Sequence, residues 1–331
     1  MKHVYTCIVC SIAVLLLCGV MSCKHTSVTR LPESPSAWKP LSDTLSLEQA
    51  CKTLSLQLAA QSTGSDTIGQ KQFYRMLDST ALYLRNSLGK RSGTPDGARE
   101  IISTIYRTWH ISFTPNDTVF STMLPQSVYG NRQGNCFGTG LLILLLAEQV
   151  HCPIYGVVLP GHFYCRYDNG KVTANIEPNK FGINHNDSYY RSRYLITDTT
   201  LYTLRNMTTK EVIGLLCYNA GTLCMTQSTI RTARALFHDA LKRLPDYPEI
   251  QGNYALAYAK AGELDSSLMI FFPLFKKYPG MNNLAINYGL VAVYAHRYKL
   301  ADSVFAVGLR YFPNNTALLN GRAAAKKALL L

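Results

Sequence analysis

Acidic residues are scarce in this sequence of 331 residues, where 20 Asp and Glu stand against 33 Lys and Arg, for a formal net charge of +13. Such a basic balance favours contact with anionic lipid headgroups or acidic polymers. The sequence also lacks a helix-turn-helix pattern, zinc-finger spacing and an RNP-like strand, so we expect no nucleic-acid partner. With 16% charged and 47% hydrophobic residues, the chain is not disordered and can bury the core of one large domain or two ordinary ones.

The N-terminal hydrophobic run is too short to span a membrane, which takes about 20 apolar residues. It follows Lys2 and ends in small residues, which is typical of a secretory signal. Its last four residues, VMSC, resemble a bacterial lipobox, in which the cysteine is acylated and becomes the first residue of the mature protein. We therefore expect a lipoprotein signal peptide at residues 1–22 and lipidation of Cys23. An ordinary signal peptide or a short anchor helix is the alternative.

The segment after the expected signal peptide is rich in Ser, Thr and Pro, so we expect residues 23–46 to be a tether from the membrane. A cluster of acidic residues, which directs lipoproteins to the cell surface in some Gram-negative phyla, is absent after Cys23. We therefore expect a protein of the bacterial cell envelope that is lipid-anchored and faces the periplasm.

Cysteines spaced as metal ligands are lacking once the expected signal peptide and Cys23 are set aside. The six that remain are irregularly spaced and include no C-x-x-C pair, so we expect no metal and no cofactor. A disulfide between Cys152 and Cys165 is one option for an exported protein, and packing as free thiols is the other. Cys217 and Cys224 would lie about 10 Å apart along a helix, which is too far for a bridge.

Two kinds of periodicity succeed each other in the first two thirds of the chain. Apolar residues recur at helical spacing in residues 47–60, 71–88 and 97–111, and an apolar core helix is expected after Cys136. Three strand-like segments follow, of which the last two are joined by Asp-Asn-Gly at residues 168–170, a strong hairpin signal. This order predicts an α+β domain with a small antiparallel sheet over residues 47–205.

The last third of the chain repeats with a period of 34 residues. Four columns of small, aromatic or proline residues keep this period: Gly221/Ala255/Gly289, Ala233/Ser267/Ala301, Phe237/Phe271/Phe305 and Pro245/Pro279/Pro313. They resemble the tetratricopeptide (TPR) repeat, with copies at about 214–247, 248–281 and 282–315 and a capping helix at 316–331. This predicts an all-α TPR solenoid over residues 206–331. A generic helical bundle is the alternative.

Cys136 stands at the expected start of the core helix, in the segment RQGNCFGTG. The helix dipole and the unpaired N–H groups of a first turn favour a thiolate, and the same N–H groups can stabilise an oxyanion. Asn135 is a plausible cap, and Gly134 and Gly138 permit close approach of a substrate. Alone, however, such a cysteine is most often a buried small hydrophobic residue.

A nucleophilic cysteine needs a base and a third group that orients the base. His162 opens the second strand, and Glu177 follows 15 residues later across the hairpin, so the two side chains become neighbours if the hairpin pairs near its turn. Asn175 shares the side of Glu177 under period-2 alternation and is the rival third member. We expect Tyr189, Tyr190 and Tyr194 to pack or to line the cleft rather than to react.

These segments, RQGNCFGTGLLILLLAEQV, GVVLPGHFYCRY and NIEPNKFG, resemble the transglutaminase-like superfamily of papain-like cysteine enzymes over roughly residues 47–194. The resemblance implies a Cys–His–Asp triad, whose first two members carry over to Cys136 and His162. The aspartate position falls on Glu177. The resemblance also places Gln126 and Asn135 near the oxyanion donors of such folds, whereas Arg132 is expected to fix the turn before the cysteine.

Together these features predict a lipid-anchored cysteine enzyme that acts on amide bonds of a peptide or protein substrate by acyl transfer. Hydrolysis, as in a protease or amidase, and transfer to an amine, as in a transglutaminase, both remain open. The TPR groove would recruit a protein partner or the substrate. The alternative is a non-catalytic interaction scaffold, in which an inactive transglutaminase-like domain provides a second binding surface; binding to anionic cell-wall polymer through basic charge is a third option.

Overall fold

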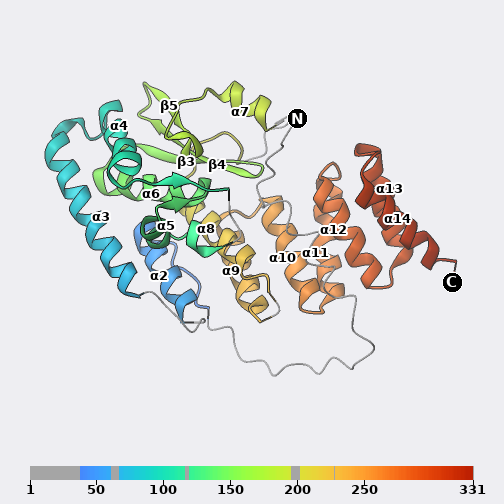
Figure 1. The fold of residues 1–331 in the computed structure, drawn as a ribbon. Coiled ribbons are helices and arrows are strands. Elements are labelled where there is room, and N and C mark those ends of the chain that lie inside the picture. The colour runs from blue at the N-terminus through green and yellow to red at the C-terminus, as the bar shows by residue number, and fades with distance from the viewer. Residues whose placement is uncertain (1–37, 61–66, 116–118, 195–201, 227, 331) are drawn as a thin grey trace. The chain divides into compact units, whose positions relative to one another are not determined.

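The computed structural model describes residues 38–60, 67–115, 119–194, 202–226 and 228–330, which form two compact units (Figure 1). The first unit comprises Lys39–Leu216, and the second includes Cys217–Leu331. The expected signal peptide, the lipidation site Cys23 and most of the expected tether lie outside the described residues.

The first unit combines helices with a small antiparallel sheet, as the sequence predicts. Its longer helices are α2 (Leu47–Ala59), α3 (Thr67–Leu88), α4 (Pro95–Ser103), α5 (Pro125–Asn131), α6 (Cys136–Val150) and α7 (Asp187–Arg193). Its short helical turns are η2 (Gly89–Arg91), η3 (Thr104–Thr108), η4 (Phe120–Thr122) and η5 (Pro178–Lys180). Its strands are β1 (Ser112–Phe113), β2 (Gln133–Gly134), β3 (Ile154–Leu159), β4 (His162–Asp168) and β5 (Thr173–Ile176). Strands β1 and β2 pair in parallel, and β3, β4 and β5 form an antiparallel sheet in that order.

Helix α6 is the centre of this unit. It contacts α2, α3, α4 and α5 as well as β3 and β4 (Figure 1), and all its residues are buried except Glu148 and Gln149. The Glu148 carboxylate accepts the backbone N–H groups of Leu47 and Glu48 at 3.0 and 3.2 Å and so caps α2. No helix in the described ranges is both long and apolar enough to cross a membrane.

Two glycines let the sheet pack closely on α6. A Cβ atom on Gly140 of α6 would lie 2.6 Å from the Phe163 ring, and one on Gly156 of β3 would lie 2.7 Å from the same ring. Because real Cβ atoms do not come so close to their neighbours, the Phe163 ring can occupy this position only between glycines. This packing fixes the start of β4 against α6.

The hairpin forms where Asn-Gly predicts it. Gly170 has a φ of +80°, and the Asn169 side chain accepts the N–H groups of Lys171 and Val172 at 3.0 and 2.8 Å. The register pairs Cys165 with Ile176. The first residue of β4 therefore lies near the residue that follows β5.

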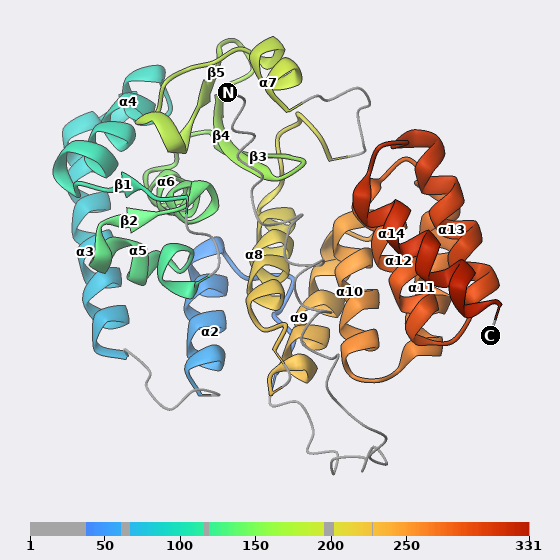
Figure 2. The ribbon, with the colours of Figure 1, turned by 45° about the vertical axis from the view of Figure 1, so that its right-hand side comes forward.

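The second unit consists of paired helices that repeat along the chain, seen one after another in Figure 2. It contains the end of α8 (Thr209–Leu223) and the helices α9 (Ile230–Arg243), α10 (Pro248–Lys260), α11 (Leu264–Lys277), α12 (Asn282–Tyr294), α13 (Tyr298–Tyr311) and α14 (Thr316–Ala328). Equivalent helices start 34 residues apart, at Pro248, Asn282 and Thr316. The predicted α+β domain followed by a TPR-like helical solenoid is therefore confirmed.

The repeating columns pack on one another inside this unit. Phe237, Phe271 and Phe305 are fully buried. A Cβ atom on Gly221 would lie 2.8 Å from the Phe237 ring, and one on Gly289 would lie 2.4 Å from the Phe305 ring. Small residues recur every 34 positions because the aromatic ring of the paired helix occupies the space of a side chain.

A buried ion pair in α9 makes the stability of this unit sensitive to substitution. Asp239 and Arg243 are each 1% exposed and are joined at 2.5 Å. Asp239→Ala leaves the guanidinium charge buried without its carboxylate and is expected to lower the free energy of unfolding by about 3–5 kcal/mol. Asp302→Ala, which breaks the more exposed pair with Arg322, is the control and is expected to cost under about 1 kcal/mol. Urea unfolding followed by circular dichroism measures both, and equal losses would contradict this account.

Candidate active site

Cys136 is the first residue of α6, as the sequence predicts. Asn135 caps the helix, because its side-chain oxygen accepts the Gly138 N–H at 2.7 Å, and its own N–H donates to the Thr122 carbonyl at 3.0 Å. The cysteine is 6% exposed. The N-terminal end of the helix dipole favours the thiolate, whereas the burial of the side chain opposes it.

His162 and Glu177 form a buried pair at the open end of the β4–β5 hairpin. His162 Nε2 lies 2.9 Å from Glu177 Oε2, and the two side chains are 3% and 5% exposed. Glu177 Oε1 accepts the Asn179 N–H at 3.0 Å, at the start of η5. The carboxylate is thus held at both oxygens, and its bond to Nε2 fixes the orientation of the imidazole.

A hydrogen bond between Cys136 and His162 completes a row of three side chains, Cys136, His162 and Glu177. Because Nε2 is engaged with Glu177, Nδ1 is the ring nitrogen that remains for the cysteine. Burial lowers the pKa of His162, but hydrogen bonds with Cys136 and Glu177 and the negative charge of both partners raise it to about 9. Burial raises the pKa of Glu177, but the bond with His162 and the imidazolium charge bring it below its ordinary value. These contacts therefore favour an imidazolium between the carboxylate and the cysteine.

Two tyrosines cover this row: Tyr190 in α7 and Tyr194 directly after it. The Tyr194 ring stacks on the His162 ring with centroids 4.8 Å apart and planes 7° apart. The Tyr190 hydroxyl donates to Glu177 Oε2 at 3.2 Å, and the Tyr190 ring stacks on the Tyr164 ring at 4.0 Å. Packing was predicted for Tyr190 and Tyr194, but the bond to Glu177 was missed. Their spacing of four residues, which puts them on one helix face, is the signal that points to a shared target.

The other predicted site residues are engaged elsewhere. Gln126 of α5 donates to Ser55 of α2 at 3.1 Å, which ties these helices together. Arg132 has a left-handed backbone conformation (φ +58°) and donates to the Trp109 carbonyl at 3.0 Å, so it fixes the turn before Asn135. Asn175 accepts from Arg166 at 2.7 Å. The structure thus brings together Cys136, His162 and Glu177, with Asn135 as the cap.

The remaining cysteines of the described residues form no bridge, and the considered Cys152–Cys165 disulfide is absent, because both are free thiols. Burial raises the pKa of Cys152 to about 12, and burial with the charge of Glu177 raises that of Cys165 further. These thiols are inert packing groups. Within the described ranges, no group of three or more His, Cys, Asp or Glu side chains is placed to hold a metal ion.

A helix-borne cysteine, a strand-borne histidine and a carboxylate across a hairpin thus lie together at the N-terminal end of α6. The model of the transglutaminase-like superfamily matches residues 71–212, so this part of the chain is a transglutaminase-like domain. No curated protein matches the chain. Among solved structures, the TPR domain of Sgt2 from Aspergillus fumigatus matches at 20% identity with a TM-score of 0.33, covering 35% of this chain and 78% of that one.

Proposed function

We propose that the transglutaminase-like domain is a cysteine enzyme that acts on amide bonds by acyl transfer. The observation that supports this best is the buried, hydrogen-bonded row of Cys136, His162 and Glu177 at the N-terminus of α6. The row supplies a nucleophile, a proton carrier and an orienting carboxylate, which are the parts that acyl transfer requires.

In the proposed reaction, the Cys136 thiolate attacks the carbonyl carbon of the amide and forms a carbon–sulfur bond. Backbone N–H groups at the start of α6 stabilise the resulting oxyanion. The His162 imidazolium gives its proton to the leaving nitrogen as the carbon–nitrogen bond breaks, which leaves a thioester on Cys136. A water or an amine then attacks the thioester, His162 accepts its proton, and the thiolate leaves. Glu177 keeps Nδ1 of His162 directed at the cysteine throughout.

Trapping of the acyl-enzyme tests this function. The full chain is incubated with glutamine-containing peptides and with a labelled primary amine, and its peptides are analysed by mass spectrometry. We expect a thioester on Cys136 and a product in which the amide has been hydrolysed or exchanged for the amine. The ratio of the two products decides between hydrolase and transglutaminase. A chain that gives no adduct and no product over a broad set of peptide amides would contradict the proposal.

The burial of the site favours a second candidate, a non-catalytic scaffold. Cys136 and His162 are each 6% exposed, and Tyr194 covers one face of the imidazole. In a scaffold the row would be a buried polar cluster, and both units would act through their surfaces. Mass-spectrometric silence of Cys136, combined with retained binding of a protein partner by the repeats, would favour this alternative.

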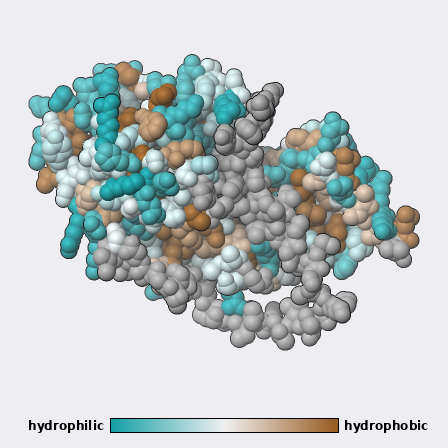
Figure 3. All heavy atoms as spheres, in the orientation of Figure 1, coloured by the Kyte–Doolittle hydropathy of each residue, from teal (hydrophilic) through white to brown (hydrophobic). Residues whose placement is uncertain are grey.

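We propose that the TPR-like unit recruits a protein partner or the substrate. Hydrophobic groups reach the surface of this unit on the face shown in Figure 3. On α11, Met269 is 76% exposed and Phe272, one turn later, is 62% exposed. Apolar side chains of this size on a helical solenoid suit a protein surface better than water. Purification of the chain with its bound proteins, compared with Met269→Ser and Phe272→Ser variants, tests this role.

We also propose that the protein is anchored by a lipid on Cys23 in a bacterial envelope and faces the periplasm. Two features of the sequence support this proposal. Residues 1–23 resemble a lipoprotein signal, and the net charge of +13 favours anionic surfaces. Metabolic labelling with a fatty acid is expected to mark the wild type and not Cys23→Ala. Protease treatment of intact cells, in which a periplasmic chain stays protected, tests the side of the membrane.

A further inference from the structure

Helix α7 reaches Glu177 through one hydroxyl group. The Tyr190 hydroxyl donates to Glu177 Oε2 at 3.2 Å, and this is the same oxygen that His162 Nε2 meets at 2.9 Å. Tyr190 is fully buried. A carboxylate oxygen that accepts a second hydrogen bond carries less charge for its first partner. Tyr190 therefore shares with His162 the oxygen that sets the basicity of the imidazole.

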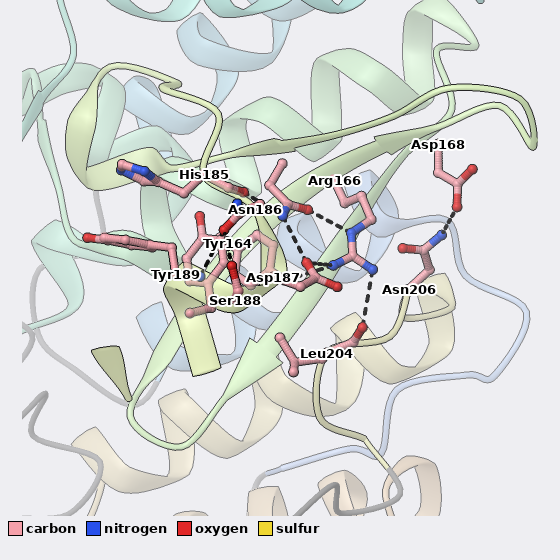
Figure 4. Close-up of polar contacts among 12 residues, drawn as sticks. Tyr164, Arg166, Asp168, His185, Asn186, Asp187, Ser188, Tyr189, Leu204 and Asn206 are labelled. Carbon is pink, nitrogen blue, oxygen red and sulfur yellow. Dashed lines mark hydrogen bonds and ion pairs between the residues drawn. The ribbon is translucent and has the colours of Figure 1, made fainter. Parts of the chain in front are cut away.

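A buried arginine on β4 holds α7 in this position (Figure 4). The Arg166 guanidinium donates to Asp187 Oδ1 of α7 at 2.6 Å and to Asn175 Oδ1 of β5 at 2.7 Å. It also donates to the Leu204 carbonyl at 3.1 Å. The Asn175 amide donates in turn to Asp187 Oδ1 at 3.0 Å. These charge-assisted bonds fix the first residue of α7 to the sheet.

The same arginine fixes the surface against which Tyr190 packs. Arg166 donates to the Tyr164 hydroxyl at 2.9 Å, and the rings of Tyr164 and Tyr190 are stacked with planes 3° apart. The N-cap Asn186, whose side chain accepts the Tyr189 N–H at 2.9 Å, sets the start of the helix. The Tyr190 hydroxyl has therefore little freedom except along its bond to Glu177.

We infer that Tyr190 is a positioning residue of the site, which shares Glu177 Oε2 with His162 and is held in place by the Arg166–Asp187 pair. The consequence for catalysis rests on the proposed function. During acyl transfer His162 must give its proton to the leaving nitrogen, and a carboxylate that holds the imidazolium too strongly slows this step. The Tyr190 hydroxyl moderates that hold, while the network fixes the carboxylate in one orientation.

Other groups face Glu177 but do not compete for this oxygen. Besides His162 and Tyr190, which share this oxygen, the titratable groups around the carboxylate are Tyr164 and Cys165 of β4, Tyr106 of η3 and Tyr194 just after α7. Tyr106 donates to the Pro178 carbonyl, and the Cys165 thiol to the Gly140 carbonyl. Cys136 faces His162 from α6 and is the same in all variants below.

Tyr190→Phe tests the inference, because it removes the hydroxyl and keeps the ring. The readout is the pKa of His162, followed by NMR in the full chain and assigned with His162→Gln. We expect this pKa to rise by about 0.5–1 unit, since Glu177 then gives its charge to the imidazolium alone. Tyr189→Phe removes the neighbouring hydroxyl of α7, which meets Lys180 and not Glu177, and is expected to leave the value unchanged.

Asp187→Asn tests the role of the network. It weakens the bond from Arg166 while keeping the shape, and we expect a smaller rise of the His162 pKa in the same direction. An unchanged or lowered pKa in Tyr190→Phe would overturn the assignment of Tyr190. A rise in that variant with no change in Asp187→Asn would overturn the role given to the Arg166 pair. The titration needs no substrate, so a chain that forms no acyl-enzyme but shows both shifts contradicts the proposed function and not this inference.

Discussion

Cys136→Ser is expected to lower the rate of acyl transfer by about 10³-fold or more, because a serine hydroxyl in this position is far less acidic than a thiol. The substitution keeps the size of a side chain that is 6% exposed, so the fold of the domain is expected to persist. The measurement is kcat/KM on a peptide amide found by acyl-enzyme trapping, together with thermal unfolding of both proteins.

Cys152→Ser is the matched control for this loss. Cys152 lies just beyond the other end of α6, and its thiol is an inert packing group whose pKa burial raises to about 12. The control is expected to retain activity within a small factor. Similar losses in the two variants, or full activity in Cys136→Ser, would rule out Cys136 as the nucleophile.

Glu177→Gln is expected to have the second largest effect, a loss of about 10²–10⁴-fold in kcat. The amide keeps the shape of the side chain but removes the charge that faces the His162 imidazolium at 2.9 Å. Burial lowers the pKa of His162 and two partners raise it to about 9, so the loss of one partner lets the pKa fall. The activity that requires an imidazolium is then expected to disappear at a lower pH than in the wild type.

Glu148→Gln provides the control for a change from carboxylate to amide in the same domain. Glu148 caps α2 and lies near the C-terminal end of α6, whereas Cys136 lies at its N-terminal end. We expect it to lower stability by about 1 kcal/mol through a weaker cap and to leave kcat unchanged. A His162 pKa that stays near 9 in Glu177→Gln, measured by NMR, would show that the carboxylate does not hold the imidazolium.

The parts of this site that depend on local sequence could be predicted from it. Asn135 before an apolar run gives both the cap and the helix start at Cys136, because capping needs only neighbouring residues. The Asn-Gly turn at Gly170 fixes the register of the hairpin, and the register brings His162 to Glu177. The residues that recur every 34 positions likewise predict how the helices of the second unit pair, because each repeat makes the same local contacts.

The parts that depend on side chains far apart in the sequence could not be predicted. The register places Asn175 opposite Arg166, four residues along β4 from His162 and therefore about 13 Å away, so it cannot be the third member. The alternation of side chains along β5 ends at Ile176, because the chain turns at Glu177 into η5. Period-2 alternation therefore does not place Asn175 and Glu177 on the same side. Tyr190 meets Glu177 where Arg166 fixes α7, and although the spacing of Tyr190 and Tyr194 puts them on one helix face, it does not identify Glu177 as their target.

The Cys136–His162 pair is tested most directly by the pH dependence of alkylation of Cys136 by iodoacetamide, measured by mass spectrometry in the wild type and in His162→Ala. A cysteine paired with an imidazolium reacts as a thiolate well below pH 8, so we expect fast labelling of the wild type at pH 6.5 and a rate lower by about 10–100-fold in the variant. Slow labelling in both proteins, with the pH profile of an ordinary thiol, would contradict a Cys136–His162 pair and favour the scaffold.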